Sequence, residues 1–218
     1  MAQTFVVRPD SSLRYSQFAL DRNVVHTEQY LTGNFTDAAF GCSTQVMLPL
    51  RLSGLSPPSR TRPSGLWRVV FAVFSKTQPP PSLSTAALVG FGRLLPIQQD
   101  PGKLRSPFGS RTFTLGYLMS GELCYNKTSL QKVQPWTLGT PIAVEIDADK
   151  RTASFFVGGK FAYLHITSLP VQDLDLALGA YLFSPDVILQ VTSCVPLKAL
   201  TPLPPAGSFQ PFDWPSDT

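Results

Sequence analysis

The sequence predicts an all-β fold, a two-sheet antiparallel β-sandwich with little helix. Its 21 prolines are spread from Pro9 to Pro215, and each proline removes a backbone donor and breaks a helical turn. Short runs of apolar, β-branched and aromatic residues recur with turn signals between them, which is typical of a sandwich. The composition, with 43% hydrophobic residues and 15 phenylalanines, allows the 218-residue chain to bury a large core.

Ten segments have the length and composition of strands. Five of them precede residue 120: a short apolar segment at 5–7 and longer runs at 45–52, 66–75, 86–95 and 111–119. Five more follow, at 141–146, 152–157, 161–166, 174–183 and 187–193. Two proline-rich stretches, 53–64 and 77–84, are predicted to be loops, and loops on a rigid sandwich often carry binding residues.

The clearest local pattern is a three-stranded meander. Apolar residues alternate with others over residues 142–146, a charged turn follows at 147–151, and the alternation returns over 153–157. The adjacent glycines Gly158 and Gly159 supply the positive φ angles of a second tight turn before residues 161–166. The apolar members of the first two strands are predicted to face the core: Ile142, Val144, Ile146, Phe155 and Val157.

Several motifs of the second half resemble a SPRY (B30.2-type) domain. They are Gly121–Asn126, Gly139–Asp147, Ser154–Lys160 and Leu176–Tyr181, with Gly65–Val69 and Leu88–Gly92 upstream. The resemblance covers roughly residues 10–195, and its specific part follows Gly65. It implies a concanavalin-like jelly roll and a non-catalytic module that presents loops from one edge of the sandwich to a protein partner.

Residues 1–200 are predicted to form one domain, because no linker-like break divides the chain into halves that each carry strands. Residues 201–218 form a tail with five prolines and the apolar residues Phe209, Phe212 and Trp214. This composition suits both a disordered terminus and a docking segment. On the second interpretation Phe212 and Trp214 contact a partner.

Charge is distributed unevenly. Residues 38–121 contain nine basic residues and one acidic residue, Asp100, whereas the segments before and after them are acidic, and the whole chain carries +4. If the arginines gather in space, they favour an acidic protein surface or RNA as a partner. The residues predicted to make that contact are Arg60, Arg62, Arg105 and Arg111. The alternative is that these side chains are simply solvated, and no basic run with interleaved aromatics favours RNA.

Catalytic motifs are scarce, so we predict no enzyme, no cofactor and no metal site. The only histidines are His26, expected to be exposed, and His165, expected to be half-buried in a strand. Gly90–Arg93 lacks the third glycine and the following helix of a dinucleotide fingerprint. Three acidic residues near the hairpin turn, Glu145, Asp147 and Asp149, do not follow a calcium-loop pattern and are expected to be solvated. Three large aromatic residues are expected in the core: Trp67, Tyr125 and Trp136.

The three cysteines, Cys42, Cys124 and Cys194, are odd in number and form no Cys-x-x-Cys pair, so buried free thiols of a reducing compartment are expected. No apolar run approaches the roughly 20 residues of a membrane span, and the first residues do not read as a secretion signal. We therefore expect a soluble intracellular protein, in the cytoplasm or in an organelle or cytoskeletal assembly.

These observations favour an adaptor or structural subunit of a larger assembly. Two alternatives stay open. The basic middle segment suggests an RNA-contacting subunit of a ribonucleoprotein. The β architecture and aromatics suggest a carbohydrate-binding or carbohydrate-processing sandwich, and an enzyme of that kind would need two carboxylates about 5 to 9.5 Å apart.

Overall fold

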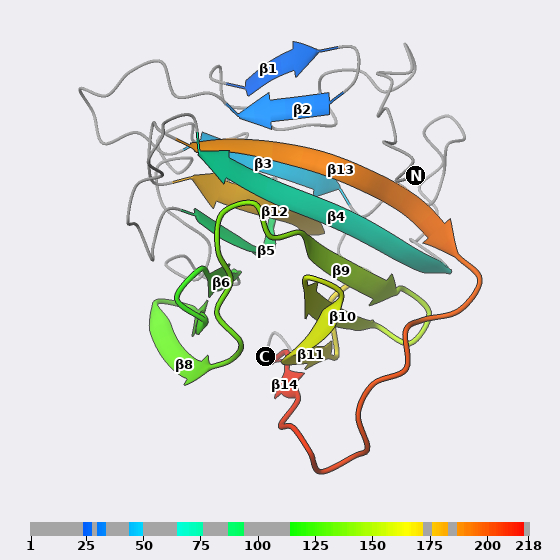
Figure 1. Ribbon diagram of the computed structural model, residues 1–218. Coiled ribbons are helices and arrows are strands. Elements are labelled where there is room, and N and C mark those ends of the chain that lie inside the picture. Colours follow the sequence, from blue (N-terminus) through cyan, green and yellow to red (C-terminus); the bar gives the residue numbers. More distant parts are fainter. Residues whose placement is uncertain are drawn as a thin grey trace.

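The computed structural model describes residues 24–27, 30–33, 44–49, 65–75, 87–93, 114–171, 176–182 and 187–215. These residues contain strands and turns and no helix, so none of them forms a helix that could cross a bilayer. The strands form two sheets (Figure 1).

Within the described ranges, the larger sheet has eight strands. In spatial order they are β1 (Val24–Thr27), β2 (Tyr30–Gly33), β13 (Val187–Leu197), β4 (Leu66–Ser75), β9 (Ile142–Asp147), β10 (Thr152–Val157), β11 (Lys160–Thr167) and β14 (Phe212–Asp213). The second sheet, counted over the same described residues, has six strands. Their order is β3 (Thr44–Pro49), β12 (Leu176–Leu182), β5 (Ala87–Arg93), β6 (Leu115–Leu118), β7 (Glu122–Tyr125) and β8 (Thr128–Lys132).

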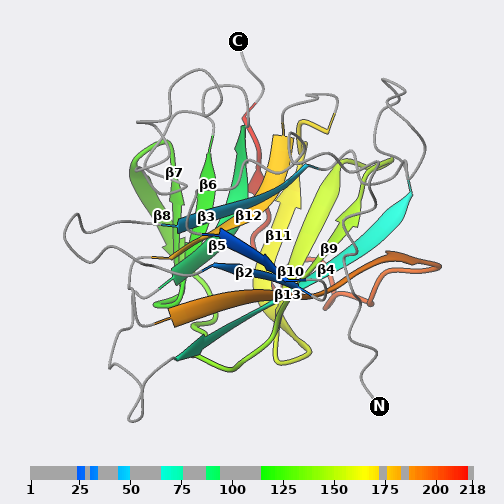
Figure 2. The same cartoon turned by 90° about the horizontal axis from the view of Figure 1, so that it is seen from above.

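Neighbouring strands pair antiparallel, apart from β11 and β14, which run parallel. Seen from above, β6 to β8 stand on one side and β9 to β11 on the other (Figure 2). The predicted all-β, two-sheet antiparallel sandwich is therefore confirmed.

The predicted hairpin is present with the expected faces. Val144 of β9 lies opposite Phe155 of β10, and Ile142 lies opposite Val157. All the side chains predicted to face the core there are at most 5% exposed. The second turn contains Gly158 at φ 56° and Gly159 at φ 82°, a backbone that favours glycine.

Aromatic rings fill much of the space between the sheets. Phe91 of β5 and Tyr117 of β6 both meet Phe155 of β10 edge to face, with ring centroids 6.1 and 5.7 Å apart. Tyr125 and Trp136 are buried with them, as expected. Trp67, also expected in the core, is partly buried and packs against it.

The close packing of strands within the smaller sheet requires glycine at position 90. A Cβ at this position would lie 1.9 Å from the backbone oxygen of Leu115 in the neighbouring strand β6. Only glycine allows β5 and β6 to approach so closely.

Five strands lie where the sequence predicts none: β1, β2, β7, β8 and β14. β8 has the polar sequence Thr-Ser-Leu-Gln-Lys and a mostly exposed surface, so it lacks the apolar alternation by which a strand is recognised. β14 has only two residues. The predicted strand at 5–7 and the predicted loops at 53–64 and 77–84 lie outside the described residues.

Candidate interaction surface

The chain between β13 and β14, residues 198–211, crosses the outer face of the larger sheet, and we call it the C-terminal strap. It leaves the end of β13 and returns to the edge of the sheet at β14 (Figure 1). Its contacts establish which face it covers. Thr201 bonds to Glu145 of β9, and Phe209 meets Phe161 and His165 of β11.

The start of the strap is held by a buried carboxylate. Glu145 is only 2% exposed. Its Oε2 accepts a hydrogen bond from the Thr201 backbone N–H at 2.7 Å, and its Oε1 accepts one from the Thr201 hydroxyl at 2.7 Å. Arg68 of β4 donates from Nε to Oε1 at 2.8 Å and forms an ion pair with it through Nη2.

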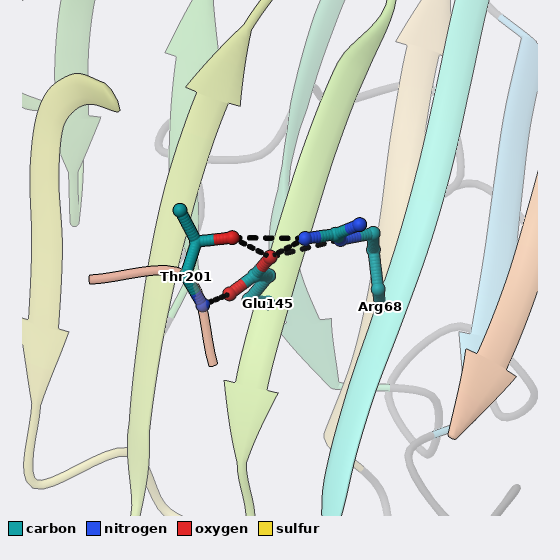
Figure 3. Close-up of polar contacts among 3 residues, drawn as sticks. All are labelled: Arg68, Glu145 and Thr201. Carbon is teal, nitrogen blue, oxygen red and sulfur yellow. Dashed lines mark hydrogen bonds and ion pairs between the residues drawn. The ribbon is translucent and has the colours of Figure 1, made fainter. Parts of the chain in front are cut away.

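Figure 3 shows that the three side chains come from β4, β9 and the strap and converge on one point. The Thr201 hydroxyl also accepts a hydrogen bond from Arg68 Nη2 at 2.9 Å. Both carboxylate oxygens and the hydroxyl are thus satisfied, which compensates for burying the charge of Glu145. We call Arg68, Glu145 and Thr201 the strap cluster.

The prediction that Glu145 and Asp147 are solvated is wrong, since Asp147 is also only 4% exposed. Both side chains point to the outer face of β9, which the sequence pattern assigns to solvent. At Glu145 this face is covered by Arg68 and Thr201. Asp147 Oδ1 accepts the Lys150 backbone N–H at 2.8 Å and so stabilises the hairpin turn. Asp149 is exposed, as expected, and accepts the Gly65 N–H at 3.1 Å. The described residues contain no group of three or more metal-binding side chains.

Four rings line the same outer face beyond the strap cluster. Phe161, Tyr163 and His165 alternate along β11 with buried residues, and Phe209 comes from the strap. The Phe161 ring lies 5.7 Å from the Tyr163 ring and 4.9 Å from the Phe209 ring, and His165 lies 6.0 Å from Phe209. Tyr163 is 52% exposed. We call these four residues the aromatic surface.

Tyr163 has a left-handed backbone, with φ at 61°. It lies where the β10–β11 register shifts, between the Ser154–His165 and Phe156–Phe161 pairs. This bulge places residues 162–164 of β11 opposite Phe155 alone. A left-handed conformation costs an ordinary residue roughly 1 to 2 kcal/mol, so the most exposed ring of the surface sits on a strained backbone.

His165 is half-buried, as expected, and its Nδ1 lies 2.8 Å from the Ser154 hydroxyl oxygen. Burial lowers the pKa of His165, because a charged imidazolium would lose its hydration. The ring therefore acts as a packed, neutral member of the aromatic surface.

The chain that follows the strap enters the sandwich at β14 and Trp214. Phe212 and Asp213 pair with Ile166 and Thr167 of β11, and the Trp214 N–H donates to the Thr167 carbonyl at 2.9 Å. The Thr167 hydroxyl donates to Asp213 Oδ1 at 2.8 Å. Hydrogen bonds from Ser168 and Thr167 lower the pKa of Asp213.

Phe212 and Trp214, which the sequence assigns to partner binding, pack on the chain's own core. Trp214 is 3% exposed, and its ring lies 5.4 Å from that of Tyr125 and 6.4 Å from that of Phe91. Phe212 is partly buried, with its ring 5.3 Å from that of Tyr125. A contact between Trp214 and a partner would require β14 to leave the sheet.

The remaining residues that the sequence assigns to partner binding, Arg60, Arg62, Arg105 and Arg111, lie outside the described residues. So do Cys42 and the side chains of His26 and Cys194.

Cys124 is a free thiol and is partly rather than fully buried. Burial, followed by the neighbouring Glu122 carboxylate, raises its pKa and keeps the thiol protonated.

Sequence reasoning missed both features of this face. The strap cluster joins residues 56 to 133 positions apart, and no local pattern announces it. The aromatic surface did leave a signal. Because Ala162, Leu164 and Ile166 face the core, the period of two places the intervening rings of β11 on the outside.

No protein-family model matches the sequence, and no curated protein matches it. Among solved structures, the SPRY domain of human HERC1 matches with 16% identity over 84% of this chain and 100% of that one, at a TM-score of 0.49. Stonustoxin matches at 14% identity and a TM-score of 0.48, over 80% of this chain and 27% of its own. The PSpry domain of TRIM65 matches at 11% identity and a TM-score of 0.46, over 85% of this chain and 98% of its own. Two of the three are SPRY domains, the family that the sequence motifs resemble. The sandwich itself is established by the strand pairings described above.

Proposed function

We propose that this chain is a non-catalytic protein–protein interaction module that works inside the cell as an adaptor or structural subunit of a larger assembly. The observation that carries the proposal is the aromatic surface. It combines a largely exposed tyrosine with three further rings on one face of a rigid sheet.

Rings of this kind suit recognition by another protein. Tyrosine is enriched among the residues that dominate binding energy, because it supplies a large contact area with few rotatable bonds. Phe156 lies beside Phe161 on the same outer face, at 4% exposure, with the two ring centroids 5.9 Å apart. Its contact with Phe161 helps to hold the surface in place before any partner arrives.

The buried carboxylates favour a structural role over catalysis. A glycosidase needs one carboxylate to donate a proton and a second to act as base or nucleophile. Glu145 and Asp147 both lie on β9, and each accepts hydrogen bonds that hold the strap or the hairpin turn. The SPRY-like motifs of the sequence also imply an interaction module without catalytic residues.

An RNA-contacting role is the second candidate, and it rests on the net charge of residues 38–121. This segment carries nine of the 18 basic residues of the chain and only one acidic residue. A contact with RNA would depend on salt, because each neutralised phosphate releases counterions. The aromatic surface has little charge of its own, so RNA and protein would occupy different parts of the molecule.

Affinity purification under native conditions separates the two candidates. The tagged chain is captured from extract with and without ribonuclease, and retained proteins are identified by mass spectrometry. We expect one or more proteins in near-stoichiometric amounts, with unchanged recovery after ribonuclease. Recovery that disappears with ribonuclease would favour the RNA candidate. Absence of any protein above the level retained by an unrelated folded bait would refute both assembly roles.

A further inference from the structure

We propose that the aromatic surface binds an extended, uncharged, proline-rich segment of a partner protein. This inference rests on the proposed function, since it names the site and the partner chemistry of the interaction module. It is carried by the charge around the surface, by the segment that already covers part of it, and by the backbone of Tyr163.

The face offers almost no charge to a ligand. β10 and residues 199–212 contain no charged residue, and the carboxylate of Glu145 is buried and paired with Arg68. β11 contributes one exposed cation, Lys160, at its start, and Asp213 lies beside its end. A ligand rich in charge would lose hydration on this face without gaining a counter-ion, so an uncharged segment is the better complement.

The molecule already places a segment of this chemistry on the same face. The strap contains Pro202, Pro204, Pro205 and Pro211 and is uncharged from residue 199 onward. It runs along the outside of the sheet to the point where Phe209 meets Phe161 edge to face. The face thus accommodates one proline-rich segment within the chain and leaves the Tyr163 ring uncovered beside it.

Proline-rich segments are natural ligands for rows of exposed rings. They hold a polyproline II conformation before binding, so little conformational entropy is lost when the proline rings lie against aromatic faces. The partly buried Phe161 and the exposed Tyr163, with ring centroids 5.7 Å apart, are neighbours on the outer face of β11, and Tyr163 leaves most of its ring open to such a contact.

Tyr163 keeps its ring in spite of a backbone that favours glycine. Strained backbone conformations cluster at functional sites, which supports Tyr163 as a contact residue. Here the ring of Tyr163 lies at the bulge and is 52% exposed, which makes it the most exposed of the four rings.

A labelled decaproline peptide tests the inference directly, with a glycine–serine decapeptide as the comparison ligand. Fluorescence anisotropy is measured on the full chain, on Tyr163→Ala and on Tyr163→Gly. The matched control is Leu130→Ala, which removes a side chain of similar exposure (43%) from the other sheet. We expect saturable binding of decaproline, weakened at least about fivefold by both Tyr163 variants and unchanged by Leu130→Ala. Equal binding of the glycine–serine peptide, full binding by folded Tyr163 variants or no saturable binding would overturn the inference.

The same variants distinguish this inference from the proposed function. If affinity purification with Tyr163→Gly recovers every partner at the wild-type level, the protein is still an interaction module but its contact lies elsewhere. If the wild-type chain recovers no partner, the proposed function fails. Sedimentation at several concentrations tests whether a second copy of this chain occupies the surface. A wild-type dimer that is lost in Tyr163→Ala would show that it does and would overturn the inference.

Discussion

At the scale of single residues, Tyr163 separates a backbone effect from a side-chain effect. Alanine and tyrosine both carry a Cβ that is disfavoured at φ 61°, whereas glycine is not. We expect Tyr163→Gly to be more stable than Tyr163→Ala by about 1 kcal/mol in urea unfolding. Equal stability of the two variants would show that the left-handed backbone is not maintained in solution.

His165 gives the protein a stability term that depends on pH. Because burial lowers its pKa in the folded state, the unfolded chain takes up the proton first as pH falls below about 6.5. The contribution is complete above that value and is lost as pH falls toward the folded pKa.

We therefore expect wild type to lose more stability than His165→Gln between about pH 7.5 and about pH 5. The measurement is urea unfolding of both proteins at the two pH values. Parallel losses would mean that groups other than His165 account for the whole pH dependence.

Residue burial also shows where sequence reasoning fails. Val144 and Phe155 could be assigned to the core because alternation in a strand defines its two faces. Glu145 occupies the face that this pattern assigns to solvent, and it is buried because Thr201 and Arg68 cover it. A covering contact between residues distant in sequence leaves no periodic signal.

At the scale of elements, the strap depends on the charge balance of the strap cluster. Thr201→Val removes the hydroxyl from Glu145 Oε1 and should cost about 1 to 2 kcal/mol. Thr201→Asp places a second carboxylate beside the first, where only Arg68 can compensate, and should cost about 2 to 4 kcal/mol. Urea unfolding gives both values, and limited proteolysis reports release of the strap. The prediction fails if aspartate is tolerated as well as valine.

Trp214, which directly follows β14, anchors this end of the chain in the core and should contribute much of its stability. Replacing the buried indole by alanine leaves a cavity beside Phe91 and Tyr125 and should cost about 3 to 5 kcal/mol. Phe74→Ala is the matched control, because that ring is 39% exposed on β4 and should cost far less. Similar losses in the two variants, measured by urea unfolding, would argue against insertion of Trp214 in the core.

The predictability of each element follows from its length and its neighbours. β9, β10 and β11 could be predicted because their alternating residues pack against the other sheet over six or more positions. β7 and β8 are short and joined by Asn126 and Lys127, both at positive φ, a turn that residue type alone does not reveal. β14 forms only because β11 offers a free edge, which is a property of the fold and not of residues 212–213.

At the scale of the whole molecule, the uneven charge makes a prediction independent of the aromatic surface. If Arg60 and Arg62 contact an acidic partner, Arg60→Glu with Arg62→Glu should weaken its retention and make retention less dependent on salt. Folding should change by no more than about 0.5 kcal/mol, as is usual for surface substitutions. Pull-down from native extract at several salt concentrations measures the effect. If the double variant recovers every partner as well as wild type does at every salt concentration, these arginines are only solvated.

The position of Trp214 in the sequence has a consequence for biosynthesis. Every other described core residue precedes it, and the rings it contacts lie at positions 91, 125 and 212. Residue 214 therefore leaves the ribosome after all the other described core residues, and the space between Phe91 and Tyr125 stays open until it emerges. A nascent chain exposes part of its apolar interior up to that point, and a chaperone that shields aromatic surface has its opportunity in that interval.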